Sequence, residues 1–235
     1  MWILILTFTV CAKVTLGEIS CSEEWYNLCE PPDLFEGIPV SPGEFANMCP
    51  QLLTYIKCLK EYEDACKEAN FSFFTKEEYE GMVSAFSELC DPESLLNAVV
   101  VDHLQCLNET FSNTLCVEES EVSLVNYKEP ISDTPIEEGF KIPSHIYCLR
   151  DILITSCIVN DISKNCGELM KGATLEILRG SLYLQQSCSF SDAKRILDQM
   201  DDFELKQRTK DYVIEVLSKL IETQFTAPYF SEMLE

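Results

Sequence analysis

Residues 49–66 read CPQLLTYIKCLKEYEDAC, with three cysteines inside a pattern of apolar residues spaced three and four apart. That spacing predicts an amphipathic α-helix. Cysteines eight or nine residues apart on a helix are separated by about 12–13 Å along its axis. A disulfide requires Cα atoms within about 7 Å of each other. Cys49, Cys58 and Cys66 therefore cannot bond to one another if one helix carries all three.

The partners must come from cysteines outside this helix. Cys21, Cys29 and Cys90 are the nearest candidates, and pairing them with the helical cysteines leaves six possible connectivities. Nine residues turn a helix through about 900°, so Cys49 and Cys58 face opposite sides. The sequence predicts a central helix that is stapled to one helix on either side. Pro50 could start this helix, which would leave Cys49 in the preceding turn.

The cysteine spacing recurs later in the chain. The two sets are Cys21, Cys29, Cys49, Cys58, Cys66 and Cys90, and Cys106, Cys116, Cys148, Cys157, Cys166 and Cys188. Their third to sixth members align almost without adjustment, although little other identity accompanies them. We expect an internal duplication with equivalent pairing in both units.

Local signals predict the other elements. Residues 75–78 form a capping box ahead of a helical apolar pattern. Asp91-Pro92 predicts an N-cap and first helical residue for the apolar stripe at 96–115. Residues 213–225 predict a final helix, and the proline-rich residues 31–42 predict a loop. Without hairpin turns or sustained alternation, the sequence predicts an all-α, disulfide-stapled helical bundle of two six-cysteine units plus a C-terminal helix.

The N-terminus is typical of an export signal. Residues 2–11 form a largely apolar run that suits a signal-peptide core and is too short to span a membrane. Thr15 and Gly17 are the small residues expected before a cleavage after Gly17. Cleavage removes Cys11 and leaves an even number of cysteines, which suits complete pairing in an oxidising compartment. This parity argues against the alternative, a buried N-terminal helix.

These boundaries divide the chain into four parts. We expect a signal peptide at 1–17, the first unit at 18–92, the second at 93–190 and amphipathic C-terminal helices at 191–235. The second unit contains an acidic insertion, residues 117–143. A binding loop and a solvated connector are the two interpretations of this insertion, and its acids and prolines favour the connector.

Two sequons fit a secreted glycoprotein. Asn70 begins the sequence NFS in a predicted loop, and Asn108 begins NET in a predicted helix. Both are predicted glycosylation sites, with an unused chance match as the alternative for each. A helical backbone presents the acceptor poorly to the glycosylation machinery, so Asn70 is the favoured site.

Charge and residue types exclude several functions. The 17 lysines and arginines against 40 acids give a net charge of −23, which makes nucleic acid and anionic membranes poor partners. His103 and His145 are the only histidines, and structural roles are favoured over a catalytic triad for both. The sequence contains no Cys-x-x-Cys and no EF-hand loop. We expect no enzyme activity, cofactor, metal site or membrane anchor.

A resemblance to known secreted domains also supports export to an oxidising compartment. The first unit carries the run EFANMC at residues 44–49, with Cys21 and Cys29 before it and Cys58 and Cys66 after it. This arrangement is similar to that of cysteine-rich, all-helical domains in secreted arachnid and nematode proteins, which are mostly of unknown function. The resemblance covers about residues 21–116, and residues 117–188 share it through their cysteines alone. The resemblance implies secretion, helices and disulfides, and it implies no catalytic or binding residues.

Two functions fit these features. The first is a secreted, acidic, disulfide-rich glycoprotein that acts by binding an extracellular protein rather than by catalysis. The second is an extracellular carrier that holds a small apolar ligand between helices. Phe71, Phe73 and Phe74 stand together and would serve a carrier. A place in the protein core is the favoured interpretation of these three rings.

The export signal yields a direct prediction. Material recovered from the medium of secreting cells should begin at Glu18, because cleavage follows Gly17. N-terminal sequencing checks this expectation. A secreted chain that still contains Cys11 would contradict both the cleavage site and the parity argument.

Overall fold

The computed structural model describes residues 21–22, 24–31, 37–67, 72–124 and 143–226. Within these ranges all regular structure is helical and no strand occurs. The predicted all-α, disulfide-stapled fold is confirmed. The expected signal peptide lies outside the described residues.

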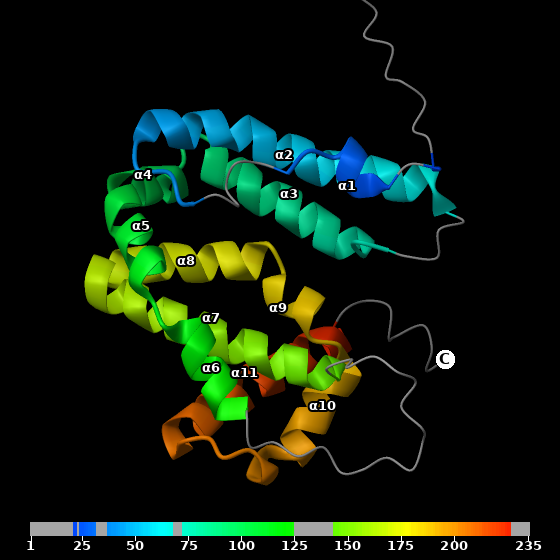
Figure 1. Cartoon of the computed structure of the whole chain (residues 1–235), viewed down its shortest axis with the longest axis vertical. Helices are drawn as coiled ribbons and strands as arrows, with labels where there is room; N and C mark the ends of the chain where they lie inside the picture. The colour runs from blue at the N-terminus through cyan, green and yellow to red at the C-terminus, as the bar shows by residue number, and fades with distance from the viewer. Residues whose placement is uncertain (1–20, 23, 32–36, 68–71, 125–142, 227–235) are drawn as a thin grey trace, which may run out of the picture.

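The helices follow one another along the chain in the order labelled in Figure 1. They are α1 (Trp25–Leu28), α2 (Pro42–Ala65), α3 (Lys76–Cys90), α4 (Leu95–Asp102), α5 (Leu104–Asn113), α6 (Cys116–Leu124), α7 (Ser144–Cys166), α8 (Glu168–Gly180), α9 (Tyr183–Ser187), α10 (Phe190–Asp198), the 3-10 turn η3 (Met200–Asp202) and α11 (Gln207–Thr226).

Helix α2 is the long helix that the cysteine-bearing stretch predicts. The side chain of Ser41 caps it by accepting a hydrogen bond from the Glu44 backbone N–H, and Pro42 is its first residue. The predicted loop therefore ends one residue before Pro42. Pro50 lies inside the helix, so the alternative start at Pro50 is wrong. The strong cap at Ser41 begins the helix earlier and fixes Cys49 on it.

The capping box of α3 is confirmed. The Thr75 hydroxyl accepts from the backbone N–H of Glu78 at 3.2 Å, and the Glu78 carboxylate accepts from the backbone N–H of Thr75 at 2.7 Å. Two N–H groups that the helix leaves unpaired are thereby satisfied. The helix then runs to Cys90, beside α2.

The predicted N-cap at Asp91 is wrong. Asp91 ends α3, and its carboxylate accepts a hydrogen bond from the Glu93 backbone N–H at 3.0 Å. Ser94 caps α4 instead, because its hydroxyl reaches the backbone N–H of Asn97 at 2.9 Å. A turn therefore separates Cys90 from the next helix.

The single apolar stripe at 96–115 is divided among separate helices. His103 breaks it, because its ring Nδ1 contacts the Val99 carbonyl oxygen at 2.7 Å. The backbone N–H of His103 bonds to Val100 instead, at 3.0 Å. Thr114 then takes an extended conformation between α5 and α6. Of the acidic insertion at 117–143, the first residues are helical in α6, whereas the sequence predicts irregular structure there.

Three layers of helices stack along the molecule (Figure 1). Helices α2 and α3 form one end, α7 and α8 the middle, and α10 and α11 the other end. The two six-cysteine units share a core between the first two layers. It contains Phe45, Met48, Leu89, Leu96, Val100, Leu104, Leu107, Ile162, Met170 and Ala173. A second core joins α7 to α10 and α11, with Phe203, Val213 and Leu217 at its centre.

Two glycines allow α3 and α8 to approach closely. A Cβ added at Gly81 would lie 2.8 Å from the carbonyl oxygen of Gly180. A Cβ added at Gly180 would lie 3.1 Å from the Cβ of Ala85. Each glycine lies eight or nine residues before the last cysteine of its unit. The two units therefore meet at near-equivalent positions.

We predict that Gly81→Ala destabilises the protein although alanine favours helices. The new methyl group meets a backbone oxygen that cannot move aside, and overpacking of this kind costs about 1–3 kcal/mol. The control is Gly172→Ala, at an exposed site of α8 with nothing within 4 Å. This substitution should raise the free energy of unfolding by about 0.5–1 kcal/mol.

Urea unfolding of the oxidised proteins measures both changes. Equal gains in stability for the two variants would show that α3 and α8 do not approach as closely as described.

Candidate functional site

All twelve cysteines predicted to pair are joined in disulfides. The bonds are Cys21–Cys66, Cys29–Cys58, Cys49–Cys90, Cys106–Cys166, Cys116–Cys157 and Cys148–Cys188, with Cα separations of 4.7 to 5.8 Å. In each unit the first cysteine pairs with the fifth, the second with the fourth and the third with the sixth. This pairing is among the six that the helix argument allows, and it repeats in the equivalent order.

The staples make α2 and α7 central helices. Cys49 connects α2 to the end of α3, and Cys58 connects it to the end of α1. In the second unit, Cys148 bonds to the C-cap of α9 and Cys157 bonds to the start of α6. Each long helix is thus held on opposite sides, as the 900° turn between its cysteines requires.

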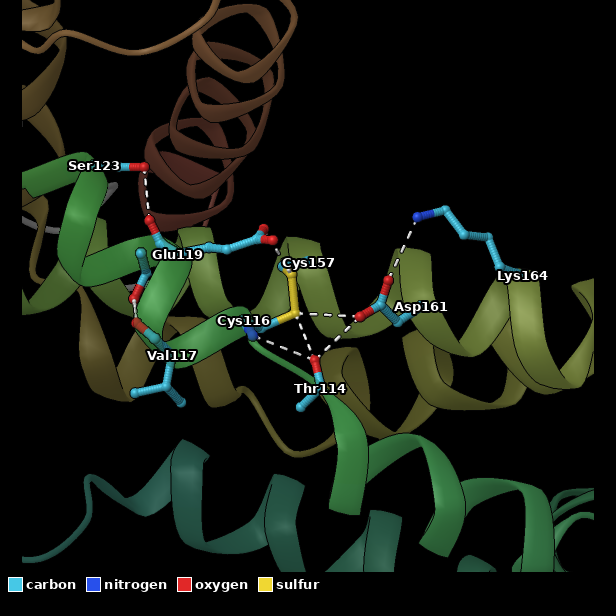
Figure 2. The surroundings of a disulfide bond; sticks show 9 residues. Thr114, Cys116, Val117, Glu119, Ser123, Cys157, Asp161 and Lys164 are labelled. Atoms are coloured by element: carbon cyan, nitrogen blue, oxygen red, sulfur yellow. Dashed lines mark hydrogen bonds and ion pairs between the residues drawn. A yellow bond between two sulfur atoms is a disulfide. The ribbon is translucent and has the colours of Figure 1, made fainter.

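The Cys116–Cys157 disulfide has an unusually polar setting (Figure 2). One carboxylate oxygen of Asp161 lies 3.6 Å from the Cys116 sulfur, and one of Glu119 lies 4.0 Å from the Cys157 sulfur. Thr114 donates to Asp161 at 3.1 Å, and Lys164 lies 3.4 Å from its other oxygen. These contacts fix the Asp161 carboxylate beside the sulfur atoms.

This cluster suits neither metal binding nor redox exchange. Cys116, Cys157 and Asp161 are spaced as metal ligands could be, but the two sulfurs are bonded to each other and are not thiolates. Reduction would create a thiolate beside one or two carboxylates, which like-charge repulsion disfavours. The geometry therefore supports a structural disulfide.

Both histidines lie in structural settings. His103 sits at the junction of α4 and α5, where its ring contacts the Val99 carbonyl. His145 lies in the first turn of α7 and is only 1% exposed. Neither histidine is among the residues described in contact with the Cys116–Cys157 disulfide.

The aromatic cluster belongs to the core of the first unit. The Phe73 ring packs edge-on against Trp25 with centroids 5.3 Å apart, and the Phe74 ring lies 6.4 Å from that of Tyr79. Both phenylalanines flank buried clusters of α2. The core interpretation therefore holds for these two rings, whereas Phe71 lies outside the described residues.

Glu63 connects the segment after α2 to that helix. Its carboxylate accepts hydrogen bonds from the backbone N–H groups of Phe73 at 2.8 Å and Phe74 at 3.3 Å, and Lys60 lies at 3.0 Å. Burial alone would raise the pKa of Glu63. The hydrogen bonds from Lys60, from these backbone groups and from Ser72 outweigh burial, so the pKa is lowered.

A shallow groove of about 640 Å³ lies where α1 meets α2. Its lining residues are Leu28, Glu30, Pro31, Pro50, Gln51, Thr54, Tyr55 and Cys58. Burial raises the pKa of the Tyr55 phenol. Sequence reasoning missed this groove, because its walls come from segments about 20 residues apart that only the Cys29–Cys58 bond brings together. The cysteine spacing was the one signal that could have indicated it.

The two predicted glycosylation sites, Asn70 and Asn108, differ in what the structure describes around them. Asn70 lies outside the described residues, and the following Ser72 is exposed. The side-chain amide of Asn108 donates to the Ile38 carbonyl at 2.7 Å. Thr110 of the same sequon is 4% exposed and accepts from Asn165. In the folded protein, the side chains of both Asn108 and Thr110 are thus engaged in hydrogen bonds.

No helix in the described ranges is long and apolar enough to cross a membrane. Comparisons with protein-family models, with curated proteins and with solved structures find no match to this chain.

We predict that Asn70 carries a glycan and that Asn108 does not. A sugar on Asn108 would attach to the amide nitrogen that binds Ile38. The Asn70→Gln variant should lose the mass shift on enzymatic deglycosylation, whereas Asn108→Gln should keep it. Glycopeptide mass spectrometry of protein from secreting cells checks both sites. A glycopeptide that contains modified Asn108 would contradict the prediction.

We predict that Glu63 stabilises the protein above its unfolded pKa. The folded pKa lies below the ordinary value of 4.5, so the contribution is present near neutrality and is lost as pH falls through the folded pKa. Glu63→Gln should lower the free energy of unfolding at pH 7 by about 1–2 kcal/mol.

The matched control is Glu80→Gln, which removes an exposed ion pair with Lys76. It should change stability by less than about 0.5 kcal/mol. Urea unfolding from pH 7 to pH 3 should show the Glu63 difference shrinking as pH falls. A difference that stays constant with pH would contradict an ionised Glu63 as its source.

Proposed function

We propose that this protein is a secreted, acidic, disulfide-stapled glycoprotein that acts by binding an extracellular partner rather than by catalysis. The observation that carries the proposal is the pairing of all twelve cysteines from Cys21 to Cys188. Disulfides form and persist in oxidising compartments and are rare where glutathione keeps thiols reduced. A chain stapled six times is therefore best suited to the extracellular space.

The staples also suit persistence outside the cell. The bonded cysteines are 29 to 60 residues apart in sequence, and each closed loop of this size contributes roughly 3–4 kcal/mol in the chain-entropy model. A rigid scaffold of this kind supports recognition by fixed surfaces. The net charge of −23 favours cationic over anionic partners.

The described chemistry fits binding better than catalysis. The ring of His103 contacts a backbone carbonyl, and His145 is buried in the first turn of α7. The carboxylates of Asp161 and Glu119 flank a closed disulfide. These groups serve the scaffold, so we assign function to the surface.

A carrier of a small apolar ligand is the second candidate. The groove between α1 and α2 favours it, because about 640 Å³ lies within the size range of ligand sites. A fluorescent fatty-acid probe separates this candidate from protein binding. Saturable binding at micromolar probe would support the carrier, and no saturable binding would exclude it for fatty acids.

Expression of the full chain in a secreting animal cell line tests the main proposal. The protein should appear in the medium, and no thiol should react with maleimide under denaturing conditions. The control lacks residues 1–17 and should stay inside the cell with reactive thiols. Retention of the full chain in the cell with free thiols would contradict the proposal.

A further inference from the structure

The groove between α1 and α2 has a composition that selects among ligands. Leu28, Glu30 and Pro31 form one wall, and residues from Pro50 to Cys58 of α2 form the other. The Cys29–Cys58 disulfide joins the two walls. Because this bond is covalent and the helix is capped and long, the groove is preformed and need not be assembled by the ligand.

The lining combines polar side chains with apolar surface. Gln51 and Thr54 lie at exposed positions of α2. The rings of Pro31 and Pro50 and the half-buried Tyr55 add apolar area to the groove.

The charge of the groove has one sign. Glu30 is the ionisable carboxylate of the described lining, and none of the lining residues is lysine or arginine. The whole chain adds a negative field, with 40 acids against 17 bases. An anionic ligand such as a fatty acid would meet repulsion, whereas a cation would be attracted from a distance and held at short range.

We propose that this groove binds a protonated organic amine with an aromatic or alkyl body. The ammonium group donates a hydrogen bond toward Glu30 and lies against the Tyr55 ring. The apolar body lies against Leu28 and Pro31. This inference rests on the proposed binding function and names the ligand class of one site.

The test uses 2-phenylethylammonium as the probe, with phenylacetate and 2-phenylethanol as anionic and neutral analogues. Titration of the isotopically labelled, secreted protein by NMR should give saturable amide shifts at Leu28, Glu30, Gln51 and Thr54. The dissociation constant for the amine should be on the order of 0.1–1 mM, as expected for a small ligand in an open groove. The two analogues should bind at least several-fold more weakly.

Two variants with matched controls localise the effect. Glu30→Gln should weaken amine binding about two- to five-fold, the range of one exposed charge pair. Thr54→Arg places a cation in the groove and should abolish binding. Glu118→Gln and Gln105→Arg make the same charge changes on α6 and α5, at exposed sites outside the groove. Both controls should bind as the unmodified protein does.

Three results would each show that the groove does not bind amines as proposed. Absence of saturable shifts, equal binding of phenylacetate, or an unchanged affinity in Glu30→Gln and Thr54→Arg would overturn the inference. None of these results would overturn the proposed function, because secretion and complete thiol oxidation are measured on the same material. Failure of secretion would overturn the proposed function, and the amine titration of refolded, oxidised protein would then test the groove alone.

Discussion

Cysteines eight or nine residues apart on one helix are too far apart to bond to each other, and this constraint determines the architecture of both units. On α2, Cys49 and Cys58 face opposite sides, so each must reach a different neighbouring helix. On α7, Cys148 and Cys157 do the same. Each unit therefore has a central helix that is covalently fixed to the elements flanking it.

The two six-cysteine units have the same pairing order and are joined through a shared core. All disulfides stay within a unit, so besides the continuous chain the two units are held together by packing and by hydrogen bonds such as that from Asn108 to Ile38. The shared core brings α4 and α5 against α8 and the middle of the molecule. Gly81 and Gly180, near-equivalent in the two repeats, allow the closest approach. A side chain at Gly81 would displace the Gly180 backbone, and one at Gly180 would press on Ala85. Close packing of α3 on α8 therefore holds the two units together where no disulfide links them.

Most of the fold followed from local sequence, whereas the site did not. The capping box at Thr75 and the helical periodicity of α2 are local patterns of the sequence, so both were predictable. The break at His103 was missed, because the competition of its ring for the Val99 carbonyl has no periodic signature. The groove depends on which of several allowed partners Cys58 takes, and sequence alone left that choice open.

The order of disulfide pairing fixes both central helices, and disulfide mapping measures that order directly. Digestion of the unreduced, secreted protein and mass spectrometry should yield first-to-fifth, second-to-fourth and third-to-sixth bonds in both units. Finding Cys49 linked to Cys58, Cys58 linked to Cys66, or any bond between the units would contradict the central helices and the duplication built on them.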